Sequence, residues 1–283
     1  SSIDVIGRVL GERIQGPLGQ PVVIDNRVGA GGTIATDAAA KAAPDGYTMV
    51  LSFNGPLSFG PHMYTKLPYD PFKDLAAVVL TTSQPNLLAV NAGLPVKSVR
   101  ELIDYVRRNP GKLNYGSIGS GSSSHLTMEL MKMQAGLFIV HIPYNGSPPA
   151  AASLAAADTQ VLFTVPTALT PLIQAGKVRA LAVSGLKRYS LMPEVPTVAE
   201  SGLAKFEAIA WNGVLVPAGT PRPIIDRLNR EMNLALESAD VRQKLNAAGL
   251  EPVGGTPEEF TRLIRAESDK WAPVIQRTGA KVD

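Results

Sequence analysis

The chain has 283 residues and a net charge of +3, and its length favours two hydrophobic cores over one. It contains no cysteine and only three histidines, which excludes disulfides and thiolate metal sites and argues against metal catalysis. Its basic residues form no run typical of nucleic-acid binding, and no apolar stretch approaches the roughly 20 residues that span a bilayer. We therefore expect a soluble, folded protein without cofactor or metal that binds no nucleic acid and does not insert into a membrane.

The first part of the chain predicts helices that alternate with short strands. The expected elements are a helix over 4–15, a strand over 22–24, a helix over 34–43 and a strand over 47–53. The glycine-rich run at 26–33 indicates a tight turn. Arg27 could face an anionic ligand, but an exposed or salt-bridged arginine is the simpler explanation. Because the chain starts at Ser1 without Met and runs directly into a helix, we expect that an upstream segment has been removed.

The middle of the chain continues this alternation. Short β-like runs are expected at 87–90, 113–115, 139–144, 161–165 and 178–183. Ser98 and Glu101 form a capping box that begins a helix ending near Asn109, and the alanine-rich run at 149–157 predicts a closely packed helix. The alternation indicates an α/β fold with a mostly parallel sheet in each lobe.

The last part of the chain predicts further helices, one beginning at Thr220 and the last at Thr256, with Trp271 as a core anchor. We expect the chain to cross between lobes near 91–97 and 209–214. The expected lobes are residues 1–93 with 213–283, and residues 94–212.

The most informative stretch is Tyr115-Gly-Ser-Ile-Gly-Ser-Gly-Ser-Ser-Ser-His125. It joins a strand pattern to a helix pattern, so we expect free N–H groups at the positive end of a helix dipole, where glycines let an anion approach. A flexible or N-capping loop is the alternative interpretation. Because Ser124 occupies the last glycine position of Gly-x-Gly-x-x-Gly, and no P-loop Gly-Lys is present, the loop argues against a nucleotide cofactor.

Other strand ends carry polar or glycine residues as well, at 52–55, 144–146 and 164–166. Ordinary turn chemistry explains each of them singly, and only their convergence favours a binding site. His141 alternates within an apolar strand and is expected to be structural. Ser122 with His125 allows a serine hydrolase as an alternative, although no Gly-x-Ser-x-Gly elbow is present. A ligand-sensing interaction module is a further alternative.

Several longer motifs together carry a resemblance to a known family. They are Asn26-Arg-Val-Gly-Ala-Gly-Gly, Ala43-Pro-Asp-Gly-Tyr-Thr, Leu67-Pro-Tyr-Asp, Tyr115-Gly-Ser-x-Gly-x-Gly-Ser-x-x-His-Leu, His141-x-Pro-Tyr-x-Gly, Ala175-Gly-Lys-Val-Arg-Ala-Leu-Ala-Val, Pro193-Glu-Val-Pro-Thr and Pro217-Ala-Gly-Thr-Pro. Over essentially its whole length the chain closely resembles the periplasmic solute-binding subunits of tripartite tricarboxylate transporters, the Bug or TctC-like family.

The resemblance implies a two-lobed type II periplasmic binding-protein fold of the Venus flytrap kind, with a ligand cleft between the lobes and no catalysis. It implies periplasmic capture of a small carboxylate for a membrane permease, and the family's ligands are di- and tricarboxylates, acidic amino acids and aromatic acids. A sensor protein is the partner that the interaction-module alternative implies. By position, the start of the first helix (1–4) and four strand-end loops would hold the ligand. The ligand-binding residues expected from this are Ser2, Ile3, Asp4, Ser52, Asn54, Gly55, Ser117, Gly121, Ser122, His125, Tyr144, Thr164 and Pro166.

The chain departs from the family pattern in two places. The family normally opens with a β-strand and a Pro/Gly-rich loop before the position of Ser1, and both are missing here. Thr164 stands where many relatives carry Asp, so an acidic partner for a ligand ammonium is lacking. We therefore expect plain di- or aromatic carboxylates rather than acidic amino acids.

Overall fold

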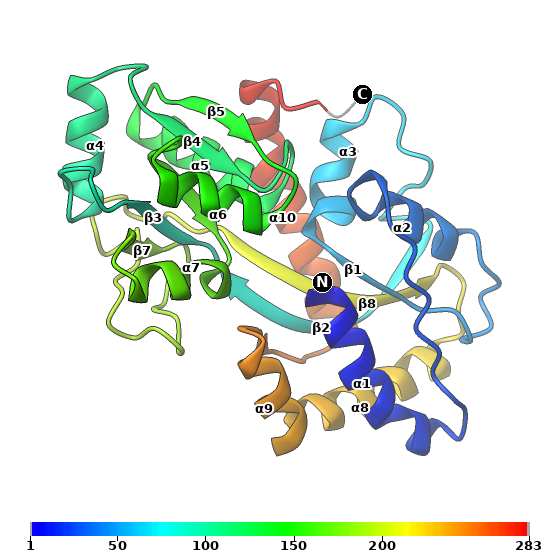
Figure 1. The fold of residues 1–283 in the computed structure, drawn as a ribbon. Helices are drawn as coiled ribbons and strands as arrows, with labels where there is room; N and C mark the ends of the chain where they lie inside the picture. Colours follow the sequence, from blue (N-terminus) through cyan, green and yellow to red (C-terminus); the bar gives the residue numbers. More distant parts are fainter. Residues whose placement is uncertain (1, 282–283) are drawn as a thin grey trace. The chain divides into compact units, whose positions relative to one another are not determined.

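The structure is a computed structural model that describes residues 2–281, and the chain forms two compact units (Figure 1). The first unit consists of residues 2–83 and 211–276, and the second of residues 84–210 and 277–281. Within residues 2–281 the chain changes unit three times, inside β2 (Leu75–Pro85), inside β8 (Ile209–Pro217) and near the end of α10 (Pro257–Thr278), so every change falls within a regular element. The lobe limits expected from the sequence stay predictions.

The first unit is built on a sheet with the strand order β1-β8-β2-β9, where β1 is Val50–Phe53 and β9 is Glu251–Pro252. The register pairs Ser52 with Gly213 in the antiparallel β1–β8 ladder, and β2 and β9 are also antiparallel. Asn212 on β8 donates through Nδ2 to Thr82 Oγ1 at 3.1 Å, and Thr81 Oγ1 donates to the Asn212 carbonyl at 2.9 Å. These side chains fasten the two long strands together.

Helices cover both faces of this sheet because alternate residues of β8 point to opposite sides. Val214 and Val216 pack with α1 (Ser2–Leu18), α8 (Arg222–Glu237) and α9 (Ala239–Ala247), whereas Trp211 and Leu215 pack with α2 (Thr33–Ala40) and α10 (Pro257–Thr278). Figure 1 shows α1 beside α8 and α9. Short elements complete the unit: η1 (Ala30–Gly32), the π-helical η2 (Gly55–Phe59) and α3 (Gly60–Met63).

The second unit is built on a five-stranded sheet with the order β5-β4-β6-β3-β7. Its strands are β3 (Leu87–Asn91), β4 (Asn114–Ser117), β5 (Val140–Pro143), β6 (Val161–Thr164) and β7 (Val178–Val183). Strand β4 is parallel to β5 and β6, while β3 is antiparallel to β6 and β7. The strands β4, β5, β6 and β7 therefore all run in one direction.

The second unit also contains the helices α4 (Val99–Arg108), α5 (Ser123–Ala135), α6 (Ser147–Ala156) and α7 (Pro166–Gln174). Ser98 caps α4 by accepting from the Glu101 N–H at 3.2 Å, and the Glu101 carboxylate accepts from the Lys97 N–H at 2.7 Å. The expected capping box is confirmed, with the carboxylate reaching the amide that precedes the cap.

The structure corrects the sequence expectations in three respects. The mostly parallel sheet expected in each lobe is wrong for the first unit, because β8 and β2 are long strands on which β1 and β9 pair antiparallel. Strands β2 and β8 themselves were not expected. Residues 22–24 form no strand, because they pair with no other strand. Their side chains alternate as expected: Val22 and Ile24 lie against the glycines of α1, while Val23 is exposed.

Gly213 gives a test of how tightly the first unit is packed. A Cβ at Gly213 would lie 2.1 Å from Cζ of Phe260, a buried ring that packs edge-on against Trp211. We expect Gly213→Ala to lower the free energy of unfolding by about 1–3 kcal/mol, measured by urea denaturation. Gly7→Ala in α1 is the matched control, since its nearest contact is an ordinary 3.5 Å and alanine favours a helix by about 0.5–1 kcal/mol. Equal stabilities for the two variants would contradict this packing.

Candidate functional site

The parallel strands of the second unit bring several predicted residues to one edge of the sheet. Ser117 ends β4 opposite Pro143 of β5, and Thr164 ends β6 opposite Leu87, the first residue of β3. Tyr144 follows β5 directly, and its N–H donates to the Ser117 carbonyl at 3.0 Å. The carboxyl ends of parallel strands meet at one edge, which is the usual place for ligands in open α/β sheets.

Three helices begin at this same edge, because each follows one of these strands. Helices α5 and α6 pack against β4 and β6, and α7 packs against β7 (Figure 1). Neither α6 nor α7 has a side chain that caps its first turn. Within residues 2–281, no acceptor is paired with the first-turn N–H groups of four residues, namely Ser123, Ser124, Ser147 and Thr167. These amides are available to an anion at the positive ends of three helix dipoles.

The loop between β4 and α5 holds its own shape through internal hydrogen bonds. The Gly119 N–H donates to Ser117 Oγ at 3.2 Å, and Ser122 Oγ donates to the Gly119 carbonyl at 2.6 Å. Ser122 also caps α5 by accepting from the His125 N–H at 3.2 Å. Gly119 and Gly121 have φ values of 134° and 74°, a region that favours glycine. Both glycines are therefore required by the conformation of the loop itself.

These bonds leave Ser122 and His125 badly arranged for hydrolysis. The Ser122 hydroxyl donates to a carbonyl rather than to an imidazole, and His125 Nδ1 accepts from the Gly121 N–H at 3.0 Å. A nucleophilic serine needs a hydrogen bond to its base.

The other predicted residues at this edge are largely committed to protein partners. The Tyr144 hydroxyl lies 2.5 Å from Ser153 Oγ on α6, and Thr164 Oγ1 donates to Ser147 Oγ at 3.4 Å. Pro166 is buried as the first residue of α7, where a missing N–H costs nothing. The backbone N–H groups at the helix starts, rather than these side chains, are therefore the unpaired donors at this edge.

Sequence reasoning missed Asn86, which lies at the same edge immediately before β3. Its Nδ2 donates to Ser123 Oγ at 2.8 Å and Thr127 Oγ1 at 3.0 Å, and its backbone exchanges hydrogen bonds with Ser184 beyond β7. A buried amide thus joins the start of α5 to the central strands. The polar run Gln84-Pro-Asn86 before an apolar strand was a usable signal.

The two histidines of this unit stack on each other beneath the loop. The rings of His125 and His141 lie 4.0 Å apart at 6°, and Tyr115 stacks on His141 at 4.7 Å. Burial lowers the pKa of both His125 and His141 to about 4, helped in His141 by the neighbouring His125. Burial, reinforced by Glu129, raises the pKa of Tyr115. Both imidazoles are therefore neutral at neutral pH.

The predicted residues of the first unit lie at the start of α1 and the end of β1. Ser2 is exposed, Ile3 is partly buried, and Ser1 lies outside the described residues. Hydrogen bonds from Arg8 and Asn26 hold the pKa of Asp4 below its usual range. Arg27 pairs with Asp25 at 2.8 Å, as expected for an ion pair.

The end of β1 is buried and closely packed. Ser52 Oγ lies 3.0 Å from Thr36 Oγ1, and both Ser52 and Asn54 are buried. A Cβ at Gly32 or Gly55 would lie 2.7 or 2.6 Å from opposite edges of the Phe53 ring. The two glycines are thus required by contact with Phe53, a function that their turn-like sequences did not reveal.

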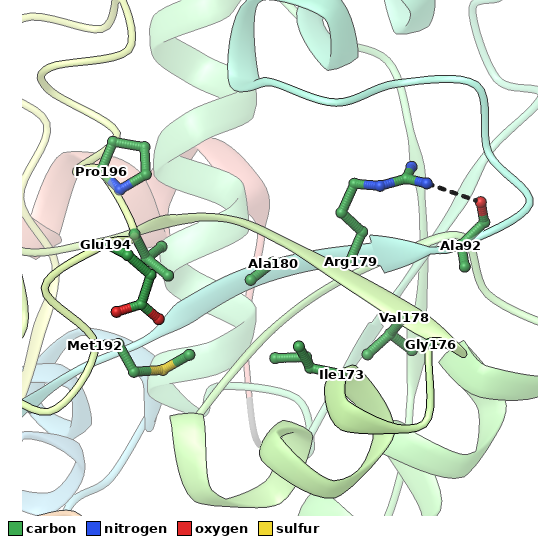
Figure 2. Close-up of a pocket in the computed structure, with 10 residues that line it drawn as sticks. Ala92, Ile173, Gly176, Val178, Arg179, Ala180, Met192, Glu194 and Pro196 are labelled. Carbon is green, nitrogen blue, oxygen red and sulfur yellow. Dashed lines mark hydrogen bonds between the residues drawn. The ribbon is translucent and has the colours of Figure 1, made fainter.

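Two cavities lie within single units. One of about 1080 Å³ in the first unit is lined by α1, residues 20–32 and β1, and includes Ile3 and Ser52. Another of about 460 Å³ lies in the second unit (Figure 2). Its Arg179 donates to the carbonyls of Val96 and Ala92, and its lining reaches from the amino end of β7 to Pro196, whose carbonyl accepts from the Val183 N–H at 2.8 Å. None of its lining residues belongs to the first turn of α5, α6 or α7.

Neither a metal site nor a membrane span is found among residues 2–281. No three His, Asp or Glu side chains gather as metal ligands would, and no helix there has the length and apolar character to cross a bilayer.

Comparison with known proteins identifies the family. The model of the tripartite tricarboxylate transporter family receptor, TctC, matches residues 6–280. The chain belongs to this family. BugT of Bordetella pertussis is 40% identical to this TctC chain over 282 residues, which cover 99% of the chain and 86% of BugT.

Solved structures agree with this assignment. R. palustris Rpa4515, solved with adipate, superposes with a TM-score of 0.85 at 37% identity and covers 98% of this chain and 93% of its own. MatC from Rhodopseudomonas palustris, with bound malate, has a TM-score of 0.81 at 32% identity and covers 96% and 94% of the two chains. The expected two-lobed periplasmic binding-protein fold is confirmed.

TctC proteins are extracytoplasmic solute-binding receptors that work with transporter permeases, and they are not enzymes. The receptor assignment is therefore confirmed and the hydrolase alternative is wrong, in agreement with the bonding of Ser122 and His125.

The buried histidines predict a pH dependence of stability. Because the pKa of each histidine is about 4 in the folded chain and about 6.5 in an unfolded one, the unfolded state binds protons first as the pH falls. The free energy of unfolding should therefore fall as the pH is lowered from 6.5 to 4. Below pH 4 the two histidines are protonated in both states and lower it no further. Between pH 7 and 5, His125 alone should lower it by on the order of 2 kcal/mol. Urea denaturation across this range measures it.

The matched control is the double variant His125→Asn with His141→Gln, which cannot titrate there. Its stability should change less between pH 7 and 5 than that of the wild type. The same slope in both proteins would show that the two histidines are not neutral in the folded state.

Proposed function

We propose that this receptor captures a small carboxylate in the periplasm and delivers it to the permease of a tripartite tricarboxylate transporter. The observation that carries the proposal is the convergence of β4, β5 and β6 at one edge, where α5, α6 and α7 begin with unpaired amides. One carboxylate group of the ligand would lie against these amides. Ser117, Gly121, Ser122, Tyr144, Thr164 and Pro166 would shape the edge, and the candidates of the first unit stay predictions.

The chemistry of this edge suits a carboxylate. None of the predicted ligand residues is Lys or Arg, so N–H groups and helix dipoles would balance the ligand's charge. Rpa4515 was solved with adipate and MatC with malate, and both ligands are dicarboxylates without an ammonium group. Thr164 offers no negative charge to a ligand ammonium. We therefore propose a dicarboxylate as the ligand, ahead of citrate, aromatic acids and acidic amino acids.

Calorimetry on the purified, never-refolded protein tests the proposal. The panel is adipate, malate, succinate, citrate, glutamate and benzoate, each titrated after exhaustive dialysis. Saturable binding of at least one dicarboxylate, tighter than that of glutamate, is expected. Failure of every carboxylate to bind would refute the proposal. A pull-down with and without the ligand separates uptake from sensing, since capture of a sensor protein only with ligand would favour the interaction module.

Removal of a single backbone donor tests where the carboxylate lies. Ser123 is the first residue of α5 and follows Ser122 at φ −71° and ψ 161°, a conformation that precedes proline readily. Ser123→Pro therefore deletes one N–H without disturbing the helix. A hydrogen bond to a charged group contributes about 1.5–3 kcal/mol, so we expect a loss of roughly 10- to 150-fold in affinity.

Ser123→Ala is the control for this substitution, because it also loses the hydroxyl that accepts from Asn86 but keeps the amide. Calorimetry of both variants gives the comparison. Equal affinities for the proline and alanine variants would mean that the ligand does not use the start of α5.

A further inference from the structure

The binding loop of the second unit rests on a stack of three rings from three elements. Tyr115 comes from β4, His141 from β5 and His125 from α5. The ring centroids lie 4.7 Å apart between Tyr115 and His141 and 4.0 Å apart between the histidines, and the ring planes are within 17° of parallel. Stacking of this kind fixes the plane of each imidazole and so fixes the direction of its nitrogen atoms.

Each imidazole uses one nitrogen to hold one end of the loop. His141 Nε2 lies 2.6 Å from Ser117 Oγ, where the loop begins. His125 Nδ1 accepts from the Gly121 N–H at 3.0 Å, where the loop turns into α5. Gly121 has a φ of 74°, so this bond holds the backbone in a conformation that few residues adopt.

The charged groups around the stack compensate one another. Glu129 Oε1 accepts from Lys132 Nζ at 2.6 Å and also accepts from the Tyr115 hydroxyl. The same carboxylate oxygen lies 4.0 Å from His125 Nε2, and Lys132 Nζ lies 5.3 Å from the centre of the Tyr115 ring. Because Lys132 neutralises the Glu129 carboxylate, the histidines remain uncharged. The neutral His125 ring therefore keeps a lone pair on Nδ1, which accepts from the Gly121 N–H.

We propose that His125 and His141 are paired positioning residues, which set the conformation of the 117–122 loop through Nδ1 of one ring and Nε2 of the other and do not touch the ligand themselves. This inference rests on the proposed function, since it concerns the same binding edge. It replaces the sequence-based expectation that His125 supplies a donor to the ligand, because the His125 side chain is buried and its Nδ1 is an acceptor already in use.

Amide side chains can mimic one imidazole nitrogen at a time, which gives a sharp test. The amide of Asn falls near the Nδ1 position of His, and the amide of Gln falls near the Nε2 position. We therefore expect His125→Asn to keep affinity for the dicarboxylate within about threefold and His125→Gln to lose about tenfold or more. At position 141 the order reverses: His141→Gln keeps the affinity and His141→Asn loses it.

A role in packing alone predicts a different result. Gln is closer to His in volume than Asn is, so packing would favour Gln at both positions. The inference is overturned if Gln binds as well as or better than Asn at position 125, or if Asn binds as well as or better than Gln at position 141. Thermal unfolding of the four variants confirms that each is folded at the temperature of the titration.

Hydrogen exchange of the Gly121 amide provides a readout that needs no ligand. In ¹⁵N-labelled protein, protection of this amide should persist in His125→Asn and drop about tenfold or more in His125→Gln. Equal protection in the two variants would overturn the inference even if the wild type binds dicarboxylates. If the wild type binds none, the proposed function fails while the exchange pattern still decides the role of the histidines.

Discussion

The unpaired N–H group at the start of a helix is the feature on which the candidate site depends. A parallel strand must be followed by a connection that returns to the opposite end of the sheet, and in the second unit that connection is a helix after β4, β5 and β6. Each helix therefore begins where its strand ends, and three positive dipole ends gather at one edge. The topology itself supplies the attraction for an anion, so no arginine or lysine is required among the predicted contacts.

Such a site is useful only if its backbone is already in place when the ligand arrives. Loop ordering costs roughly 1–2 kcal/mol per residue, and a loop of glycines and serines has much freedom to lose. Here Ser117, Ser122 and His125 each hold a backbone group of the loop, and Asn86 joins the start of α5 to the central strands. This cost is met during folding rather than at binding, which leaves more of the interaction energy for affinity.

The sequence predicted the polar strand ends well but not the connections between them. Runs such as Val161–Thr164 are apolar and bounded by turn residues, so their ends could be located, and parallel pairing then placed Ser117 and Thr164 together. Strands β2 and β8 were missed because their neighbours lie far away along the chain and no local turn signal marks where the chain changes unit. The role of Phe53 was hidden for a related reason: a contact between Gly32 and a ring 21 positions later has no pattern in the sequence.

The neutrality of the histidine stack has a consequence for the receptor's response to its surroundings. A histidinium at the site would attract carboxylates strongly below pH 6 and weakly above pH 7, since its charge would change within that interval. His125 and His141 have pKa values near 4, so their charge is constant above about pH 5. The attraction for the ligand then comes from backbone dipoles, which do not titrate. A receptor exposed to an environment of variable pH would in this way keep one affinity for a fully ionised carboxylate. Any change of binding with pH would then come from ionisation of the ligand and not from titration of the site.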